Sequence, residues 1–423
     1  MVFHPREGRN PSAWTRREFL WRSAALGVSL PTLSAILSAC ADGSNATADL
    51  AIGTPSSPVS QPLFDDNPAI ASGLAKEDGP LQLYNWEQYI NPDTIPAAEE
   101  ALGTEIVVNT FFNEEEALQK LISGELSFDV WFPTAQSVPK VVAGKLLQPL
   151  NHEYIPNLGN VWPQLASPFY DQGSQYTVPY VVYQTGIAWR VDLVDSADIE
   201  GQENPWDVFW NSKYNGIAGL YDDFRETLYM TMFRNGVTDP INATPDQITA
   251  AADSLIELID LMNIRFSIDG TYTGIPEGRF GLHEAWSGDV VATPSYFPEG
   301  SDPTVMRYLW PVRSGSSARG LIANDTLAVL KGAPHPVLAH QFINFMLDEA
   351  NALENFGWNG YQPPQNGLDV NLLVEDEWVP DYLSSAIVLP EDFDNPRAVV
   401  AVQIPAEQEA LLLDAWSRVQ SGA

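Results

Sequence analysis

The chain has 423 residues, of which 45% are apolar and 13 are Trp, so it can bury a large core in two or three units. It carries 21 Lys and Arg against 55 Asp and Glu, a formal net charge of −34. Because proteins bind nucleic-acid phosphates through clustered Lys and Arg, this charge argues against a nucleic-acid partner and favours a cationic ligand. An acidic surface can also be a solubility or salt adaptation, so the bulk charge alone identifies no ligand.

The N-terminal region has the features of an export signal. Arg16 and Arg17 precede a mostly apolar run over residues 23–39, which ends at Cys40, the only cysteine in the chain. The run includes a proline and is shorter than the ~20 residues needed to span a membrane. The pattern resembles a bacterial twin-arginine signal peptide over residues 1–39 with a lipobox, and it predicts that Cys40 becomes the lipidated first residue of the mature chain.

The segment that follows the cysteine has the composition of a linker. Residues 40–80 are rich in Ala, Ser, Pro, Gly and Asp and show no sustained apolar period, which predicts a flexible tether. A tether agrees with a lipid on Cys40, because the folded part then stands away from the membrane. The folded part is predicted to begin near Leu81.

Beyond Leu81, short apolar strands alternate with helices, which is typical of α/β folds. The first elements follow the order β-α-β-α-β, which predicts a parallel sheet. The predicted strands are residues 81–84, 105–110, 128–132, 176–181, 216–221, 280–286 and 321–330. The predicted helices are residues 96–102, 114–123, 137–143, 223–233, 244–262, 336–349 and 405–420.

Motifs for catalysis or metal binding are scarce. The chain has no His-Glu-x-x-His, no Gly-x-Ser-x-Gly and no phosphate loop, and its nearest histidine pair, His335 and His340, falls on different faces of a helix. Ser137 and Lys140 have the spacing of a Ser-x-x-Lys hydrolase motif, but its companion motifs are absent, and a helix N-cap explains the string better. We therefore predict no metal, no cofactor and no catalytic residue.

Several acids lie where predicted strands end. Asp223 and Glu226 stand where a strand leads into a helix, and their spacing fits a capping box with Asp223 as the N-cap and Glu226 at the third helical position. The same place fits a ligand site, because α/β proteins bind ligands at the carboxyl ends of their strands. Asp325 is at a strand too, and it can be either a turn aspartate or a ligand residue.

Large aromatic residues show a similar distribution. Trp86 and Tyr89 follow the first strand, Trp286 ends a later strand, and Tyr361 lies in a Gly-Tyr-Gln-Pro-Pro string. Each residue alone is more typical of a core, since aromatic rings dominate cores. Together with the acids they predict a cleft with aromatic walls and carboxylate ends, which suits a ligand that carries separated positive charges on an apolar stem.

Over nearly all of residues 81–420 the chain resembles the periplasmic spermidine/putrescine-binding proteins of ABC importers. The Asn-Trp-x-x-Tyr and Asp-Asp-x-Arg-Glu strings, in this order, are fairly specific to these proteins. The strings that carry the resemblance are Leu83-Tyr84-Asn85-Trp86-Glu87-Gln88-Tyr89-Ile90, Phe128-Asp129-Val130-Trp131-Phe132-Pro133-Thr134, Val178-Pro179-Tyr180, Asp222-Asp223-Phe224-Arg225-Glu226, Asn324-Asp325-Thr326-Leu327-Ala328 and Gly360-Tyr361-Gln362-Pro363.

The resemblance implies an α/β fold in two lobes, with the ligand cleft at the hinge. Lobe 1 would comprise residues 81–182 plus 324–369, and lobe 2 residues 183–323 plus 370–423. The ligand-binding residues that it implies are Trp86, Tyr89, Thr134, Gln136, Asp223, Glu226, Trp286, Asp325 and Tyr361. Gln136 stands where the family usually has Tyr, and Ala323 where a second Trp is common, so one wall of the aromatic box is missing or is supplied elsewhere.

The function that the resemblance implies is capture of a polyamine and its delivery to the permease of an ABC importer, without catalysis. The protein would act outside the cytoplasm as a monomer, held at the membrane by a lipid on Cys40. One alternative is an exported hydrolase of the glycosidase type that uses Asp223 or Glu226 as its acid. Another keeps the binding-protein fold and changes the ligand to a sugar or another cation.

Overall fold

The structure is a computed structural model, and it describes residues 50–124, 127–315 and 317–422. The predicted signal peptide over residues 1–39 and the predicted lipid site Cys40 lie outside these residues. In the part of the chain that is described, no helix is both long enough and apolar enough to cross a membrane.

The first elements form parallel strands with connecting helices. They are β1 (Leu81–Trp86), α3 (Thr94–Leu102), β2 (Ile106–Phe111), α4 (Glu114–Ser123) and β3 (Val130–Trp131). β1 pairs in parallel with β2 and with β3, so the predicted parallel sheet is confirmed. Both helices end at a glycine in the left-handed conformation, Gly103 and Gly124, whose backbone N–H closes the last turn.

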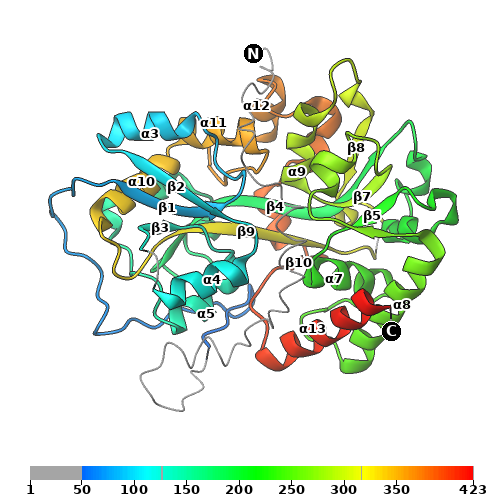
Figure 1. Cartoon of the computed structure of the whole chain (residues 1–423), viewed down its shortest axis with the longest axis horizontal. Helices are drawn as coiled ribbons and strands as arrows, with labels where there is room; N and C mark the ends of the chain where they lie inside the picture. The colour runs from blue at the N-terminus through cyan, green and yellow to red at the C-terminus, as the bar shows by residue number, and fades with distance from the viewer. Residues whose placement is uncertain (1–49, 125–126, 316, 423) are drawn as a thin grey trace.

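Two long strands, β4 (Thr177–Arg190) and β9 (Gly320–Val329), run through both halves of the molecule (Figure 1). β4 pairs with β9 as far as Gln184 and with β7 (Leu282–Trp286) from Thr185 onward. The sheet order is β2-β1-β3-β9-β4-β7-β5-β6, with β5 at Ala218–Leu220 and β6 at Arg265–Phe266. Every residue of β9 is buried, as expected for a central strand that is covered on both faces.

Helices cover both faces of the sheet, and they gather in two groups that form the two lobes (Figure 1). The lobe 1 helices are α3, α4, α5 (Val138–Ala143), α6 (Pro163–Ala166), α10 (Pro336–Met346) and α11 (Glu349–Asn359). The lobe 2 helices include α7 (Phe224–Arg234), α8 (Pro245–Met262), α9 (Ser287–Ala292) and α13 (Ala406–Ser421), and the remaining elements are α12 (Val370–Glu375), β8 (Met306–Leu309) and β10 (Ala398–Val400). The predicted α/β fold in two lobes is confirmed.

The helix predicted over residues 336–349 is α10, which ends at Met346, and a second helix that was not predicted, α11, begins at Glu349. The side chain of Asp348 accepts hydrogen bonds from the backbone N–H groups of Ala350 and Asn351, so it caps the start of α11. An N-cap residue has a non-helical backbone, and this interrupts a run that is apolar on both sides. The prediction missed the boundary because the apolar period continues across it.

Residues 50–80, which we call the N-terminal strap, differ from the flexible tether that composition predicted. The Gln61 side chain is 3% exposed and donates a 2.7 Å hydrogen bond to a backbone carbonyl of lobe 1, and the Asn67 side chain donates a 2.8 Å bond to the carbonyl of Leu147. Glu77 accepts the backbone N–H groups of the first turn of α10. Polar residues that look like linker in composition therefore fasten the strap to lobe 1, because each one satisfies a backbone group that folding would leave without water.

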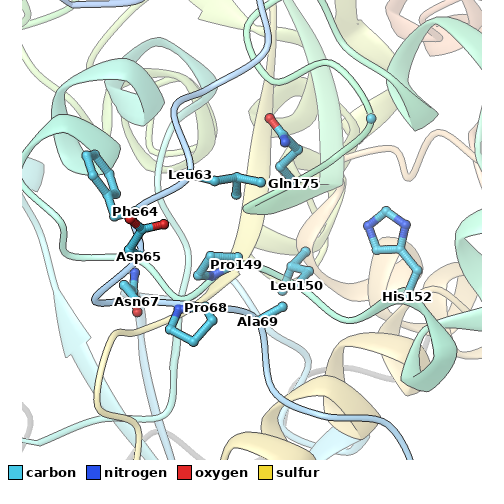
Figure 2. Close-up of a pocket in the computed structure, with 11 residues that line it drawn as sticks. Leu63, Phe64, Asp65, Asn67, Pro68, Ala69, Pro149, Leu150, His152 and Gln175 are labelled. Carbon is cyan, nitrogen blue, oxygen red and sulfur yellow. The ribbon is translucent and has the colours of Figure 1, made fainter.

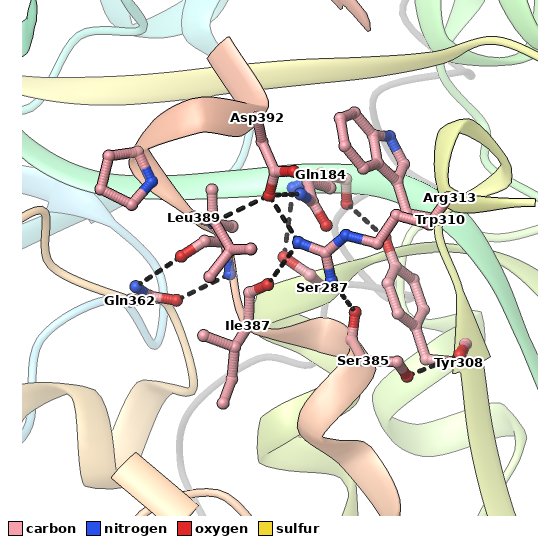
Figure 3. Close-up of polar contacts among 12 residues, drawn as sticks. Gln184, Ser287, Tyr308, Trp310, Arg313, Gln362, Ser385, Ile387, Leu389 and Asp392 are labelled. Atoms are coloured by element: carbon pink, nitrogen blue, oxygen red, sulfur yellow. Dashed lines mark hydrogen bonds and ion pairs between the residues drawn. The ribbon is translucent and has the colours of Figure 1, made fainter. Parts of the chain in front are cut away.

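The segment over residues 385–392 lies beside the place where β4 changes its pairing partner from β9 to β7 (Figure 3). Asp392 is 5% exposed; its Oδ2 accepts from Gln184 Nε2 at 2.6 Å and from the backbone N–H of Leu389 at 2.8 Å, and it pairs with Arg313. Gln362 holds the same segment through both backbone groups of Val388. The Asp392 carboxylate thus holds this segment to β4, and Gln362 holds it to lobe 1.

A largely buried ion pair also joins the two lobes. Lys140 of α5 lies 3.4 Å from Glu409 of α13, and both side chains are less than 15% exposed. Arg225 of α7 lies 3.9 Å from the same Glu409 oxygen. This contact joins a lobe 1 helix to two lobe 2 helices.

Replacing Asp392 with Asn should lower the free energy of unfolding by roughly 1–3 kcal/mol, because the buried carboxylate accepts from Gln184 and from the backbone N–H of Leu389, and Asn lacks its charge and one of its two acceptor oxygens. Urea denaturation measures the loss. Asp394→Asn, at an exposed position two residues further on, is the matched control and should change the free energy by less than about 0.5 kcal/mol. Equal losses in the two variants would contradict a fastening role for Asp392.

Candidate ligand-binding site

Four aromatic rings meet at the lobe junction, and three of them belong to residues predicted from the sequence. The ring of Tyr183 lies 6.2 Å from that of Trp286 and 5.8 Å from that of Tyr361, and Tyr361 lies 5.1 Å from Tyr89, centroid to centroid. We call Tyr89, Tyr183, Trp286 and Tyr361 the ring cluster. All contacts are edge-to-face, the geometry that ring quadrupoles favour.

Tyr183 occupies the wall that the sequence left open. In the ladder between β4 and β9, Tyr183 is paired with Ala323, the residue that stands where the resemblance implied a second Trp. Directly paired residues project from the same face of a sheet, so a small residue on one strand leaves room for a ring from the other. Sequence reasoning missed Tyr183, because it lies inside a strand-like apolar run.

The ladder places the predicted residues along one face of β4. Alternate residues of a strand share a face, so Val181, paired with Asp325, lies on the same face as Tyr183 and as Thr185, which is paired with Trp286. From Val181 to Thr185 the strand advances about 13 Å. Asp325 and Trp286 are therefore held apart at opposite ends of the ring cluster by backbone hydrogen bonds.

Asp325 is the carboxylate at the lobe 1 end. It is 5% exposed, and its Oδ2 accepts a 2.6 Å hydrogen bond from the hydroxyl of Tyr89, while Oδ1 has no hydrogen bond of normal geometry. Burial raises the pKa of Asp325 to about 7, and the negative charge of Glu114 adds to the rise, whereas the Tyr89 and Tyr183 hydroxyls oppose it. Asp325 is thus a strand residue at the ring cluster and not a turn aspartate.

Asp223 and Glu226 stand at the start of α7, on the lobe 2 side. Asp223 Oδ1 accepts the backbone N–H groups of Arg225 and Glu226, each at 2.9 Å, so its predicted role as the N-cap is confirmed. Glu226 does not complete the predicted capping box, because its Oε2 accepts instead from Thr185 Oγ1 at 2.8 Å. Burial, with the Asp223 charge, raises the pKa of Glu226 to about 7.

The polar residues predicted on lobe 1 lie beside Asp325. Thr134 forms a backbone bridge with Asp325, and its hydroxyl donates to Glu114 at 2.8 Å. Gln136, in the short turn that follows, has a buried Oε1 without a hydrogen-bond partner. Trp86 is further from the ring cluster by its contacts: its indole N–H donates to the carbonyl of Phe132, and its ring packs on Phe111 in the lobe 1 core.

Asp289 lies beside the ring cluster and was not singled out by sequence reasoning. It accepts hydrogen bonds from the hydroxyls of Tyr361 at 2.8 Å and Tyr221 at 3.1 Å, and the Tyr221 ring stacks on Trp286 at 4.1 Å. Gly288 lets Tyr361 approach, because a Cβ there would come within 2.4 Å of the Tyr361 ring. The signal was an acid three residues after Trp286, at the start of a helix.

Two hollows of the surface lie away from the ring cluster. One of about 450 Å³ lies between the N-terminal strap and lobe 1, lined by Leu63, Pro149 and His152 among others (Figure 2). None of the predicted ligand residues lines it. Because Tyr89 and Asp325 are each less than 10% exposed, we expect the lobes to separate before a ligand reaches them.

Among the described residues, no group of three or more His, Cys, Asp or Glu side chains is arranged to hold a metal ion. The acids at the lobe junction are spread along the ring cluster, with hydroxyl groups as their partners. Such an arrangement suits a large cation with apolar parts better than a metal ion.

Two α/β lobes that share a pair of through-running strands, with acids and rings at their junction, define a solute-binding protein. The sequence pattern of the bacterial extracellular solute-binding proteins matches residues 95–378, and the chain belongs to this family. The resemblance seen in the sequence is thereby confirmed.

Two periplasmic or amine-binding relatives are 27% and 26% identical to the chain over the residues that align. The putrescine-binding periplasmic protein PotF of Escherichia coli is 27% identical over 285 residues, which cover 65% of this chain and 75% of PotF. A putrescine/agmatine-binding protein of Pseudomonas aeruginosa is 26% identical over 355 residues, 81% of this chain and 92% of its own. The crystal structure of the spermidine/putrescine transporter substrate-binding protein PotD from Streptococcus pneumoniae superposes with a TM-score of 0.64 at 22% identity, covering 81% of this chain and 98% of PotD, which supports the fold.

The raised pKa values of Glu226 and Asp325 predict a pH-dependent stability. Both groups have a folded pKa near 7 and an unfolded pKa near 4, so the native state binds more protons between these values. This stabilisation is complete below about pH 4 and is lost as the pH rises to 7. In urea denaturation from pH 5 to 8, Glu226→Gln should flatten the profile and be more stable than the wild type at pH 8, by on the order of 2 kcal/mol. Glu257→Gln, at an exposed position, is the control. An unchanged profile in Glu226→Gln would refute the assignment.

Proposed function

We propose that the protein binds a polyamine such as spermidine or putrescine outside the cytoplasm and delivers it to an ABC importer. The observation that carries the proposal is the ring cluster with a carboxylate of each lobe beside it. Asp325 lies two residues along β9 from Ala323, the partner of Tyr183, and Glu226 accepts from Thr185, two residues along β4 from Tyr183. Burial raises the pKa of Tyr183, and the charges of both acids add to the rise.

This arrangement matches the chemistry of a polyamine. Ring faces pack against methylene groups and attract ammonium groups, and the carboxylates accept charge-assisted hydrogen bonds from the ends of the ligand. We propose as ligand residues Tyr89, Tyr183, Trp286, Tyr361, Asp223, Glu226 and Asp325, with Thr134 and Gln136 as polar neighbours on lobe 1. We also propose Trp86, which packs on Phe111 and donates to the carbonyl of Phe132, as a ligand residue of lobe 1. The named relatives, which bind putrescine, agmatine or spermidine, support the same ligand class.

A hydrolase is the less favoured function. Asp223 is committed to capping α7, and Glu226 has a hydroxyl donor as its partner, so a pair of free carboxyl groups across a scissile bond is not formed at this place. Membership of a solute-binding family favours binding without turnover.

We assign the lobes as residues 81–182 plus 324–369 and 183–323 plus 370–423, and propose that the protein works as a monomer.

Calorimetric titration with spermidine, putrescine and a neutral disaccharide tests the ligand class. The wild type should bind both amines, and Asp325→Asn should weaken this binding by roughly 2–5 kcal/mol, because a desolvated ammonium loses its carboxylate. Asp394→Asn, at an exposed position, should bind as the wild type does. Heat from the disaccharide alone would refute the polyamine assignment.

We also propose that the chain is exported through a twin-arginine signal and anchored by a lipid on Cys40. The support is the sequence over residues 16–40, with its paired arginines, apolar run and terminal cysteine. Cys40→Ser should move the protein from the membrane fraction to the soluble exported fraction, with polyamine affinity unchanged. The fractions are compared by immunoblot, and membrane retention of the variant at wild-type levels would contradict the lipid anchor.

A further inference from the structure

Glu284 is a buried acid in lobe 2 that none of the sequence motifs includes. It lies in the middle of β7 with 0% exposure. One carboxyl oxygen, Oε2, accepts from Thr227 Oγ1 at 3.0 Å and from the backbone N–H of Tyr221 at 3.3 Å. The other oxygen, Oε1, is buried without a hydrogen-bond partner. An unpartnered buried oxygen is costly, so its surroundings call for a physical explanation.

The strand register places this carboxyl close to the proposed ligand residues. Glu284 is paired with Ile187 and Trp286 with Thr185, so Glu284 shares a face of the sheet with Trp286 and Thr185. Glu226 reaches the same face from α7, where it accepts from Thr185. Glu284 accepts from Thr227, the residue that follows Glu226 on α7, so one carboxyl group from the strand and one from the helix lie in the same region, and the charge of Glu226 acts on Glu284.

No basic side chain neutralises this pair. Within the described residues, neither Glu226 nor Glu284 has a Lys or Arg nitrogen within the 4 Å that defines an ion pair. From α7, Asp223 adds a further negative charge, and the positive charge of Arg225 partly offsets it at Glu226. His283 packs against Gly270 and Phe280, and burial lowers its pKa to about 4, so it is neutral at pH 7.

The remaining neighbours of Glu284 are neutral or indirect. Directly after β5, Tyr221 donates its backbone N–H to Glu284, and its hydroxyl donates to Asp289 of α9. Two adjacent carboxyl groups in a buried place cannot both ionise, because each charge disfavours the other and burial disfavours both. One proton between them relieves the conflict, and Oε1 of Glu284 is the atom free to carry it.

We propose that Glu284 and Glu226 share one proton when no cation is bound, and that the cationic group of the ligand displaces this proton. The carboxyl O–H bond breaks, the proton passes to solvent, and the ammonium bound at Glu226 supplies the positive charge that the proton had supplied. Glu284 is thus a positioning residue that acts through Glu226. The inference rests on the proposed function, because it needs a cation at Glu226.

Proton release on binding is the quantity that tests this role. We would titrate the full-length protein with spermidine at pH 7 in two buffers of different ionisation enthalpy and calculate the protons released per ligand. The wild type should release protons both from this pair and from Asp325. Glu284→Gln should lower the release by about half a proton per ligand, because its amide can donate to Glu226 without titrating. Glu257→Gln is the control and should match the wild type.

The outcomes separate the two proposals. Spermidine binding with equal proton release in the wild type and in Glu284→Gln would overturn the role of Glu284 and leave the proposed function standing. Absence of spermidine and putrescine binding to the wild type would overturn both. If Glu284→Gln does not fold, infrared difference spectra of Asp325→Asn at saturating spermidine replace it: loss of a protonated carboxyl band on binding supports the shared proton, and an unchanged band overturns it.

Discussion

The arrangement of the ligand site depends on one backbone constraint, the continuous hydrogen bonding of β4 first to β9 and then to β7. Because the partner exchange falls between Gln184 and Thr185, alternate residues on a single face of β4 lie opposite Asp325, Ala323, Trp286 and Glu284 in turn. Acids and rings from two lobes are thereby placed in one row at fixed intervals. The order along this row follows from strand register, and side-chain packing then refines it.

This geometry buries acids that have no basic partner, and their burial lowers the stability of the fold. Asp325, Glu226 and Glu284 all have raised pKa values, mainly because burial disfavours their charged forms. Fully paired acids would be more stable but would offer less to an incoming cation, since the ligand would have to displace an internal Lys or Arg. The protein thus accepts lower stability at the place where a cation is to bind, which is common at functional sites.

Sequence reasoning predicted much of the fold and part of the site. The β-α-β-α-β order and the apolar periods identified most elements, and the Asp-Asp-x-Arg-Glu string located Asp223 and Glu226. What the sequence could not supply was pairing between distant residues. Tyr183 and Glu284 enter the site only because of their cross-strand partners, and the strap over residues 50–80 is held by Gln61, Asn67 and Glu77, whose buried partners are far along the chain. Composition gives no information on the cross-strand partners or on the partners of the strap.

The strap gives the two lobes unequal mechanical roles. Its amide and carboxylate contacts are made with lobe 1, whereas the C-terminal helix α13 packs on α7 and α8 of lobe 2. A load applied through the N-terminal side of the chain is therefore borne by lobe 1 before it reaches the junction. An opening of the junction near Gln184, where β4 exchanges partners, would therefore move lobe 2 relative to lobe 1. A partner protein that recognises the ligand-bound form by its shape would therefore distinguish it by the position of lobe 2.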